Sequence, residues 1–433
     1  MKPENKPVPE PAGAIPSTAV GAIRHESGVR SPRAASYVLA DIEVTEKLPS
    51  LSVPEGRTGL GIVVRCNDRP VGFIMTEATP GEKLTPQQLT DLVGERIGNV
   101  QFEAKSSTED YPKLPSLTVA ICTKDHPEDL AQCLRQLLKL RNAQTDFDIL
   151  IIDNAPSDER TRNVAESLPN VRYVMEPKPG LNFARNRALR EATSDWLAFI
   201  DDDVTVDRIW LRGLRKAIGE NPDLGGVTGL VLPAQLETEA QILFERRGGF
   251  EKNFNTTRYT GTMPGHPFYP CVGGKFGTGC NMAFLRRVLL ELGGFDEALD
   301  TGSALPGGGD TDILYRVVRA GYPLIYEPEF LVYHRHRREY GQLRRQYCYS
   351  WAQGLMAFAV KSYRSDVAQR PNLRRLVLWW FGDKLRELRM SLRRQHLMTP
   401  DILLAELYGG IVGLVFAYPR SLKRTEEIRR RNR

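Results

Sequence analysis

The stretch WLAFIDDDVTVD, which spans Trp196–Asp207, decides the fold. Its first five residues are apolar, and they stop at three consecutive carboxylates, Asp201, Asp202 and Asp203. A short apolar run bounded by polar residues is typical of a buried strand. Carboxylates at the C-terminal end of such a strand lie at the edge where open α/β sheets bind ligands. The stretch therefore predicts a sheet strand that leads into a binding site.

Asp201 and Asp203 are two residues apart, so in an extended chain their side chains can point the same way. Two neighbouring carboxylates repel each other unless a cation lies between them. Mg²⁺ and Mn²⁺ prefer oxygen ligands, and Mg²⁺ is usually held by one or two carboxylates together with substrate phosphates. The alternative is a solvated acidic turn after the strand, and the rest of the chain must decide between the two.

Length and composition indicate a globular protein of two or three domains, because the chain has 433 residues, 26% of them charged and 41% hydrophobic. The net charge is only +6, but Lys and Arg crowd the region after Tyr333. A basic surface there suits anionic lipid or a phosphorylated substrate as well as it suits nucleic acid. We expect no nucleic-acid partner.

The six cysteines are scattered and form no CxxC pair, which predicts reduced, mostly buried thiols in a cytoplasmic protein. The N-terminus lacks the apolar core of a signal peptide. No run of about 20 apolar residues is present, so we expect no membrane-spanning helix.

Four regions follow from composition and periodicity. Residues 1–34 are rich in Pro, Gly, Ser and Ala and predict a disordered tail. Residues 35–105 predict a small α+β module, residues 114–345 an α/β domain, and residues 346–433 a helical region. In the module we expect strands at Tyr37–Val44, Gly59–Arg65 and Val71–Met75, a hairpin turn at Asn67–Pro70 and a helix at Thr85–Ile97.

From Leu117 the pattern alternates between strand and helix, which predicts a mostly parallel sheet covered by helices. We expect strands at Leu117–Cys122, Phe147–Ile152, Val171–Met175 and Trp196–Ile200, and helices at Pro127–Lys139, Asp158–Leu168 and Leu181–Ala192. Polar residues recur just past the strand ends: Thr123, Asp125, Asp153 and Asn154. Several strand ends that meet in one crevice make a site in such a fold.

Eight segments in this order resemble the family 2 glycosyltransferases, which have the GT-A fold. They are LTVAICTKDHPEDL (117–130), FDILIIDNAPSD (147–158), GLNFARNRAL (180–189), LAFIDDDV (197–204), GTGCNMAFLRR (277–287), GGFDEALD (293–300), GGGDTDILYRVVRAGY (307–322) and VYHRHRR (332–338). The resemblance covers about residues 116–345. It implies a Rossmann-like, mostly parallel sheet with helices on both faces, beside the small N-terminal module and the C-terminal helices.

The resemblance also implies roles for residues on the donor side. Thr123, Asp125 and Asp153 would line the nucleotide pocket, and Asp153 would accept a hydrogen bond from the base. Arg185 would approach the base or the diphosphate, in a loop that Asn186 supports.

Other residues would hold the metal and carry the chemistry. Asp201 and Asp203 would hold Mg²⁺ or Mn²⁺ on the diphosphate, with Asp202 among the donor contacts. His334 would complete the metal shell or contact the diphosphate, a role for which His336 competes. Asp310 would be the catalytic base.

The chain departs from the family pattern in three places. Gly309 stands where a Glu usually precedes the catalytic Asp, which puts the acceptor contact of that Glu in doubt. The turn DNAPSD replaces a DDGS-like turn. QYCYSW at Gln346–Trp351 lacks the Arg and the spacing of the QxxRW motif found in processive synthases, so we expect transfer of one sugar.

Each assignment has a structural alternative. Asp310 and Asp312 could be stabilising carboxylates at a helix N-terminus. Arg185 could be a surface arginine, and Asp153 could cap the following turn. His334 and His336 could belong to a solvated basic run.

The C-terminal region contains a basic amphipathic segment, Leu373–Leu392, and an apolar one, Ile402–Tyr418, before an arginine-rich tail. The first could lie on an anionic bilayer or pack on the catalytic domain. The second is short for a span and is interrupted by Glu406 and three glycines. The tail would strengthen attraction to anionic headgroups.

The leading hypothesis is an inverting, metal-dependent glycosyltransferase that moves one sugar from a nucleotide-diphosphate sugar to a saccharide or lipid-linked saccharide in cell-surface glycan synthesis. We expect a cytoplasmic protein, peripheral on the inner face of the plasma membrane. One alternative is a non-catalytic scaffold that binds nucleotide sugar or protein partners. Another is a nucleotidyltransferase, although TKDHPE after the first strand of the α/β domain is not a phosphate loop.

Overall fold

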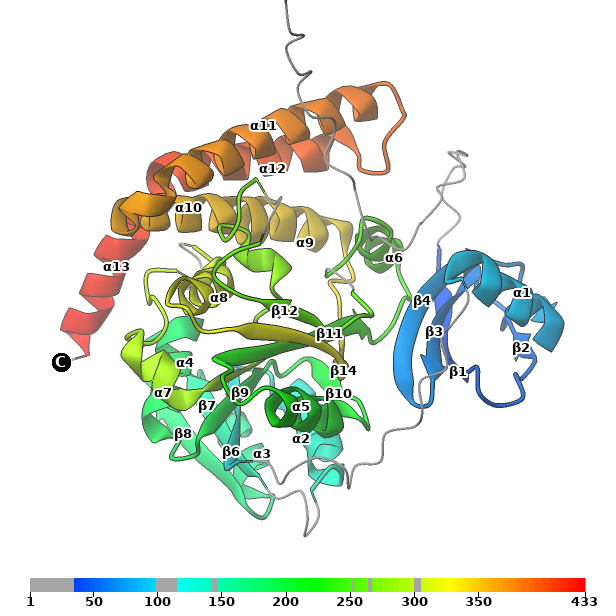
Figure 1. The fold of residues 1–433 in the computed structure, drawn as a ribbon, viewed down its shortest axis with the longest axis horizontal. Helices are drawn as coiled ribbons and strands as arrows, with labels where there is room; N and C mark the ends of the chain where they lie inside the picture. The colour runs from blue at the N-terminus through cyan, green and yellow to red at the C-terminus, as the bar shows by residue number, and fades with distance from the viewer. Residues whose placement is uncertain are drawn as a thin grey trace, which may run out of the picture.

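The computed structural model describes residues 35–98, 115–141, 147–250, 253–263, 267–299 and 305–432. The expected disordered tail (residues 1–34) lies outside these ranges. Figure 1 shows a small N-terminal module, a central sheet covered by helices, and a layer of C-terminal helices. This confirms the predicted α/β architecture.

The N-terminal module is a three-stranded sheet with one helix. β3 (Gly59–Cys66) pairs in parallel with β1 (Tyr37–Glu43) and antiparallel with β4 (Arg69–Glu77). The hairpin forms at the expected turn, where Asn67 and Asp68 both adopt positive φ. Thr85 caps α1 (Pro86–Arg96) through a capping box with Gln88. The short β2 (Leu51–Ser52) and β5 (Lys83–Leu84) pair beside it.

The central sheet has the order β10-β14-β11-β13-β9-β6-β7-β8, with β12 against β14. Among the described strands, six run in one direction and β10, β12 and β13 run opposite to them. The strands are β6 (Leu117–Thr123), β7 (Asp148–Asn154), β8 (Val171–Glu176), β9 (Trp196–Ile200), β10 (Val204–Val206), β11 (Gly226–Pro233), β12 (Thr257–Tyr259), β13 (Asn281–Leu285) and β14 (Leu324–His334).

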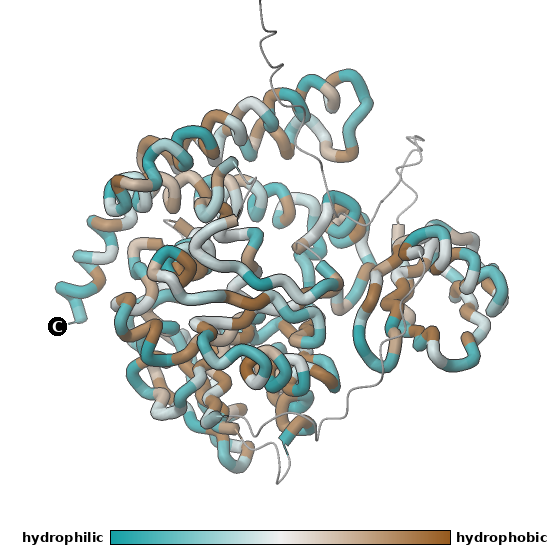
Figure 2. Tube along the Cα trace, in the orientation of Figure 1, coloured by the Kyte–Doolittle hydropathy of each residue, from teal (hydrophilic) through white to brown (hydrophobic). Residues whose placement is uncertain are grey.

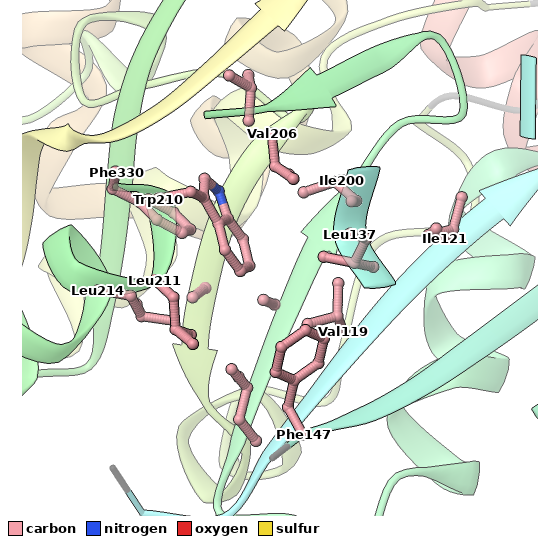
Figure 3. Close-up of a cluster of buried hydrophobic side chains, with 14 of the residues drawn as sticks. Val119, Ile121, Leu137, Phe147, Ile200, Val206, Trp210, Leu211, Leu214 and Phe330 are labelled. Atoms are coloured by element: carbon pink, nitrogen blue, oxygen red, sulfur yellow. The ribbon is translucent and has the colours of Figure 1, made fainter. Parts of the chain in front are cut away.

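Helices cover both faces because the central strands are apolar on both sides. On β9, Ala198 and Ile200 face one core, whereas Leu197 and Phe199 face the other. The first core, drawn in Figure 3, takes residues from α2 (Pro127–Lys139), α3 (Arg160–Glu166) and α5 (Trp210–Glu220). The second takes residues from α4 (Leu181–Glu191), α7 (Arg286–Glu291) and α8 (Gly309–Arg319).

The C-terminal helices form a third layer over α8 and α6 (Glu239–Arg246). They are α9 (Tyr340–Arg345), the π-helix η2 (Gln346–Gln353), α10 (Gly354–Ser365), the 3₁₀ turn η3 (Val367–Gln369), α11 (Arg370–Leu392), α12 (Pro400–Val412), the π-helix η4 (Gly413–Ala417) and α13 (Tyr418–Arg431). A further 3₁₀ turn, η1 (Gly273–Lys275), precedes β13 in the central domain. Ile402 and Leu403 of α12 pack against Phe244 of α6 and Tyr347 of η2.

The N-terminal module is tied to the central sheet by one fully buried guanidinium. Arg65 of β3 pairs with Asp207 after β10 at 2.6 Å and with Asp41 of the module at 2.7 Å. It also donates to the Tyr333 hydroxyl of β14 at 2.8 Å. The module therefore supports the strands that flank the acidic turn.

Arg65→Ala is expected to lower the free energy of unfolding by about 3–5 kcal/mol, because Asp207 would stay buried without its cation. Urea unfolding measures the loss. Arg57→Ala is the matched control: its ion pair with Glu237 also joins the module to the central domain but is exposed, so its loss is expected to cost under about 1 kcal/mol. Equal losses in the two variants would contradict a buried anchor at Arg65.

Candidate active site

The carboxyl ends of β6, β7 and β9 meet at one edge of the sheet. The three strands are parallel and in register, so that Thr123 lies opposite Asp153, and Ile121 lies beside Ile200. Thr123, Asp153 and the Asp triplet therefore gather at the same edge. This is the crevice in which open α/β sheets bind ligands.

The Asp triplet forms a turn between β9 and β10 and is not an extension of the strand. β10 then pairs antiparallel with β14, which brings His334 opposite Val204. One ligand atom each from Asp201, Asp203 and His334 lies within 4.8 Å of the others. His334 Nε2 is 3.5 Å from Asp203 Oδ1.

Two carboxylates and one imidazole make a donor set that fits Mg²⁺ or Mn²⁺. Burial lowers the pKa of His334 to about 4, so its imidazole is neutral at pH 7. The neutral ring is the form that can bind a metal. The negative charge of the two carboxylates and the neutral state of the His334 imidazole therefore both suit a divalent ion.

Asp202 is buried and engages the end of β6. Its Oδ2 accepts a hydrogen bond from Thr123 Oγ1 at 2.5 Å and lies 3.2 Å from His126 Nδ1. The hydrogen bond to Asp202 raises the pKa of His126. His126 was not predicted as a site residue, although it follows a strand end as Thr123 and Asp125 do.

Asp125 and Asp153 lie at the ends of β6 and β7. Asp125 adopts positive φ and accepts hydrogen bonds from the Ser157 backbone and hydroxyl, both at 2.8 Å. Asp153 Oδ2 accepts from the Tyr173 hydroxyl at 2.9 Å. Its Oδ1 is buried and has no hydrogen-bond partner among the described residues, and burial raises the pKa of this carboxyl. An acceptor atom is thus available there for a ligand donor.

Asp310 lies in the first turn of α8. Its Oδ1 accepts from the Thr311 backbone N–H at 2.7 Å, and its Oδ2 accepts from that of Gly279 at 3.1 Å. Asn281, two residues after Gly279, pairs with Ile200 at the end of β9, directly before the acidic turn. The hydrogen bond between Gly279 and Asp310 therefore places Asp310 near that turn.

Close packing explains the three glycines before Asp310. A Cβ on Gly307 would lie 2.1 Å from the Ser350 carbonyl oxygen of η2, and Gly308 adopts φ of +100°. A Cβ on Gly309 would lie 2.3 Å from Asn182 Nδ2. The buried Asn182 is fixed, since it donates to the Asp296 and Leu299 carbonyls at 2.9 and 2.6 Å. A glutamate at position 309 would not fit this packing.

Arg185 lies beside Asp310 and away from the surface. It is buried, donates to Asn182 Oδ1 at 3.3 Å and to the Gly279 carbonyl at 3.4 Å, and lies over the Phe295 ring. Asn186 is also buried. Its Nδ2 donates a hydrogen bond to the Phe295 carbonyl, and its Oδ1 accepts one from the Phe295 N–H. The reading of Arg185 as an ordinary surface arginine was therefore wrong.

Asp312 and His336 both have structural partners. Asp312 is fully buried and pairs with Arg316 and Lys361. His336 lies behind His334 and contacts Glu245 at 2.7 Å. No sequence signal identified Glu245, because α6 brings it to the histidines only in the folded chain.

Residues 118–293 match the family described as Glycosyl transferase family 2. The chain is 29% identical over 224 residues to the succinoglycan biosynthesis protein ExoM of Rhizobium meliloti, a match that covers 50% of this chain and 66% of the relative. It is 25% identical over 257 residues to a pre-mycofactocin glycosyltransferase of Mycobacterium tuberculosis, covering 58% of this chain and 50% of the relative.

The chain thus spans between half and two thirds of the length of these two relatives. Among solved structures, it is similar to a mannosyltransferase of Pyrobaculum calidifontis in complex with GDP-Man and Mn²⁺. That likeness has a TM-score of 0.45 and 17% identity, and covers 70% of this chain and 90% of the other.

Proposed function

We propose that this chain, which belongs to the family 2 glycosyltransferases through its domain at residues 118–293, transfers one sugar from a nucleotide-diphosphate sugar to an acceptor hydroxyl with inversion. The observation that carries the proposal is the cluster of Asp201, Asp203 and His334 at the sheet edge, with Asp310 bonded to Gly279 close to the end of β9. A metal-binding donor set and a separate carboxylate are the two parts that this chemistry requires.

Asp201, Asp203 and His334 would hold Mg²⁺ or Mn²⁺. When bound, the ion supplies a Lewis acid that offsets the negative charge of the diphosphate. On the donor side, Asp153 Oδ1 would accept a hydrogen bond from the base, and Asp125 and Thr123 would line the pocket. The buried Arg185 guanidinium, close to Asp310, would add positive charge near the reacting groups.

Asp310 would act as the base. Its carboxylate takes the proton of the acceptor hydroxyl while the acceptor oxygen bonds to the anomeric carbon and the bond to the diphosphate oxygen breaks. The Gly279 and Thr311 N–H groups orient its two oxygens. A single carboxylate that acts as the base on the side opposite the leaving group would give inversion.

A saccharide or lipid-linked saccharide is the proposed acceptor, in cell-surface glycan synthesis. The succinoglycan biosynthesis protein among the relatives supports this acceptor class. Gly309 leaves the scaffold alternative open, although packing against Asn182 accounts for the glycine. The presence of Asp201, Asp203 and Asp310 argues against a scaffold.

Thermal unfolding with UDP, GDP and dTDP, each with and without Mn²⁺ or Mg²⁺, tests the donor site. A ligand that binds only the folded protein stabilises it by about 2.7 kcal/mol at 100 times Kd. We expect one diphosphate to raise Tm, and to do so only with metal. The same nucleoside monophosphate is the matched control, because it lacks the diphosphate that the metal would bridge. Absence of any shift at millimolar ligand would contradict the proposal.

We also propose that the C-terminal layer rests on an anionic membrane at the inner face of the plasma membrane. Residues 370–433 contain 15 Lys and Arg against six Asp and Glu, a net charge of +9 in a chain of net +6. Leu404, Tyr408, Ile411 and Val415 are exposed and share one side of α12 and η4. Figure 2 shows hydrophobic and hydrophilic residues alternating along these helices.

The continuous helical stretch Pro400–Arg431 is long and apolar enough to cross a membrane, but 44% of its apolar window is buried within the protein. The full length of this helical stretch was not predicted from the sequence. The glycines interrupt the apolar run in the sequence, but the helix continues through them. Gly409 and Gly413 lie where Cβ atoms would meet the Cys348 and Gln353 carbonyls. Because one side of this helix packs closely on the rest of the protein, contact with the membrane surface is favoured over crossing it.

Flotation with vesicles measures this contact. The protein is expected to bind vesicles that contain anionic lipid, and not neutral phosphatidylcholine, with affinity that falls as salt is added. Ile411→Ser with Val415→Ser is expected to weaken binding at least about 10-fold, since each side chain contributes roughly 1.5–3 kcal/mol when buried in lipid. Leu290→Ser, an exposed apolar residue of α7, is the matched control. Equal binding by all three proteins would exclude this surface.

A further inference from the structure

A buried chain of three titratable side chains lies behind the acidic turn. Glu245 Oε1 is 2.7 Å from His336 Nε2, and His336 Nδ1 is 3.1 Å from His334 Nδ1. His334 Nε2 then faces Asp203 Oδ1 at 3.5 Å. Glu245 and His336 are both at least 95% buried, with 2% and 4% of their surface exposed.

At a pH at which Glu245 is ionised and both imidazoles are neutral, the hydrogen bonds of this chain allow one arrangement of the protons. An ionised Glu245 can only accept, so His336 Nε2 carries the proton that it receives. The Nδ1 atom of a neutral His336 is then an acceptor, and His334 Nδ1 must donate to it. A neutral His334 with its proton on Nδ1 presents the lone pair of Nε2 to Asp201 and Asp203.

That arrangement is unfavourable without a cation, because a lone pair and two carboxylates face one another. It is also the form that a metal ion needs, since only the unprotonated nitrogen can coordinate. The longer 3.5 Å distance to Asp203, compared with the contacts of 2.7 and 3.1 Å behind it, fits a nitrogen that does not donate there.

The surrounding rings and one amide hold the two imidazoles in place. Phe244 lies 4.7 Å from the His336 ring, and Phe250 lies 5.1 Å from the His334 ring, measured between centroids. Gln241 Nε2 donates to the His336 carbonyl at 3.1 Å. Because these contacts already fix the positions of the two rings, Glu245 determines only which ring nitrogens carry the protons.

We propose that Glu245 and His336 are positioning residues that keep His334 in the Nδ1–H tautomer, with Nε2 prepared to bind the divalent ion. This proposal rests on the metal role of His334 in the proposed function. Partners behind a metal-binding histidine typically change metal affinity 10–100-fold when they are lost.

The test is ¹⁵N NMR of protein labelled at its six histidines, recorded without metal. Long-range correlations report which ring nitrogen carries the proton, and His334→Asn identifies the His334 signal. We expect the Nδ1–H form in the wild type. In Glu245→Leu we expect the Nε2–H form, because His334 can then donate to Asp203 and accept from His336.

Conservative and control variants separate positioning from folding. Glu245→Gln keeps an acceptor oxygen for His336 and is expected to retain the wild-type tautomer. Glu237→Leu, which removes a more exposed carboxylate just before α6, is expected to leave it unchanged. His336→Leu removes the acceptor of His334 directly and serves if Glu245→Leu does not fold.

Mn²⁺ titration followed by electron paramagnetic resonance supplies the second readout. The Kd for Mn²⁺ is expected to rise about 10–100-fold in Glu245→Leu and to change little in Glu245→Gln. An Nε2–H tautomer in the wild type, or an unchanged tautomer in both Glu245→Leu and His336→Leu, would overturn the proposal. A wild type that keeps the Nδ1–H form but does not bind Mn²⁺ would instead count against the metal role in the proposed function.

Discussion

Asp310→Asn is expected to lower kcat about 10²–10⁴-fold, the usual contribution of a general base. Asparagine keeps the size of the side chain and an oxygen that can accept from Gly279 or Thr311, but it cannot take the proton of the acceptor hydroxyl. The metal-dependent stabilisation by nucleoside diphosphate should be retained. Initial rates of sugar transfer, measured beside thermal shifts, check both expectations.

Asp312→Asn is the matched control on the same turn of α8. This carboxylate is fully buried between Arg316 and Lys361, so its loss is expected to cost stability, about 3–5 kcal/mol, and to spare kcat of the folded enzyme. If Asp312→Asn reduced kcat as strongly as Asp310→Asn, the role assigned to Asp310 would be indistinguishable from support of the helix N-terminus and would be given up.

Asp203→Ala is expected to reduce kcat/KM about 10²–10³-fold, the range found when a preorganised electrostatic group is removed. The variant loses one of the three side chains of the candidate metal site and leaves His334 without its facing carboxylate. Its Tm should no longer rise when diphosphate and Mn²⁺ are added together. Steady-state kinetics over a range of Mn²⁺ concentrations measures the effect.

Asp223→Ala serves as the control for a lost surface carboxylate, because Asp223 pairs with Arg258 at an exposed position. We expect Asp223→Ala to keep full activity. Activity of Asp203→Ala restored at high Mn²⁺ would still agree with a weakened metal site. If Asp203→Ala were as active as the wild type at low Mn²⁺, the proposed metal role of Asp203 would be contradicted.

Much of the central fold could be predicted from local sequence. Both Pro127–Lys139 and Trp196–Ile200 have the predicted bounds, because a helical apolar stripe in one and an uninterrupted apolar run in the other leave little choice of structure. The helix α8 begins at Gly309, so that Asp310 lies within its first turn.

The candidate site was predicted in part. Thr123, Asp153 and the Asp triplet follow strand ends, and parallel strands bring such ends together, so their meeting at one edge followed from the pattern. His126, Glu245 and the packing role of Asn182 were missed, since each acts through a partner more than 70 residues away.

The sequence by itself determined the alternation of strands and helices, the order of the motifs and the position of the carboxylates at strand ends, because these depend on periodicity and local geometry. The tertiary structure decided which of two histidines faces the acidic turn, that Gly309 packs on Asn182 and that Arg65 anchors the N-terminal module. These features depend on distances between side chains from separate elements. Such distances are set by the packing of the whole chain, which no local pattern specifies.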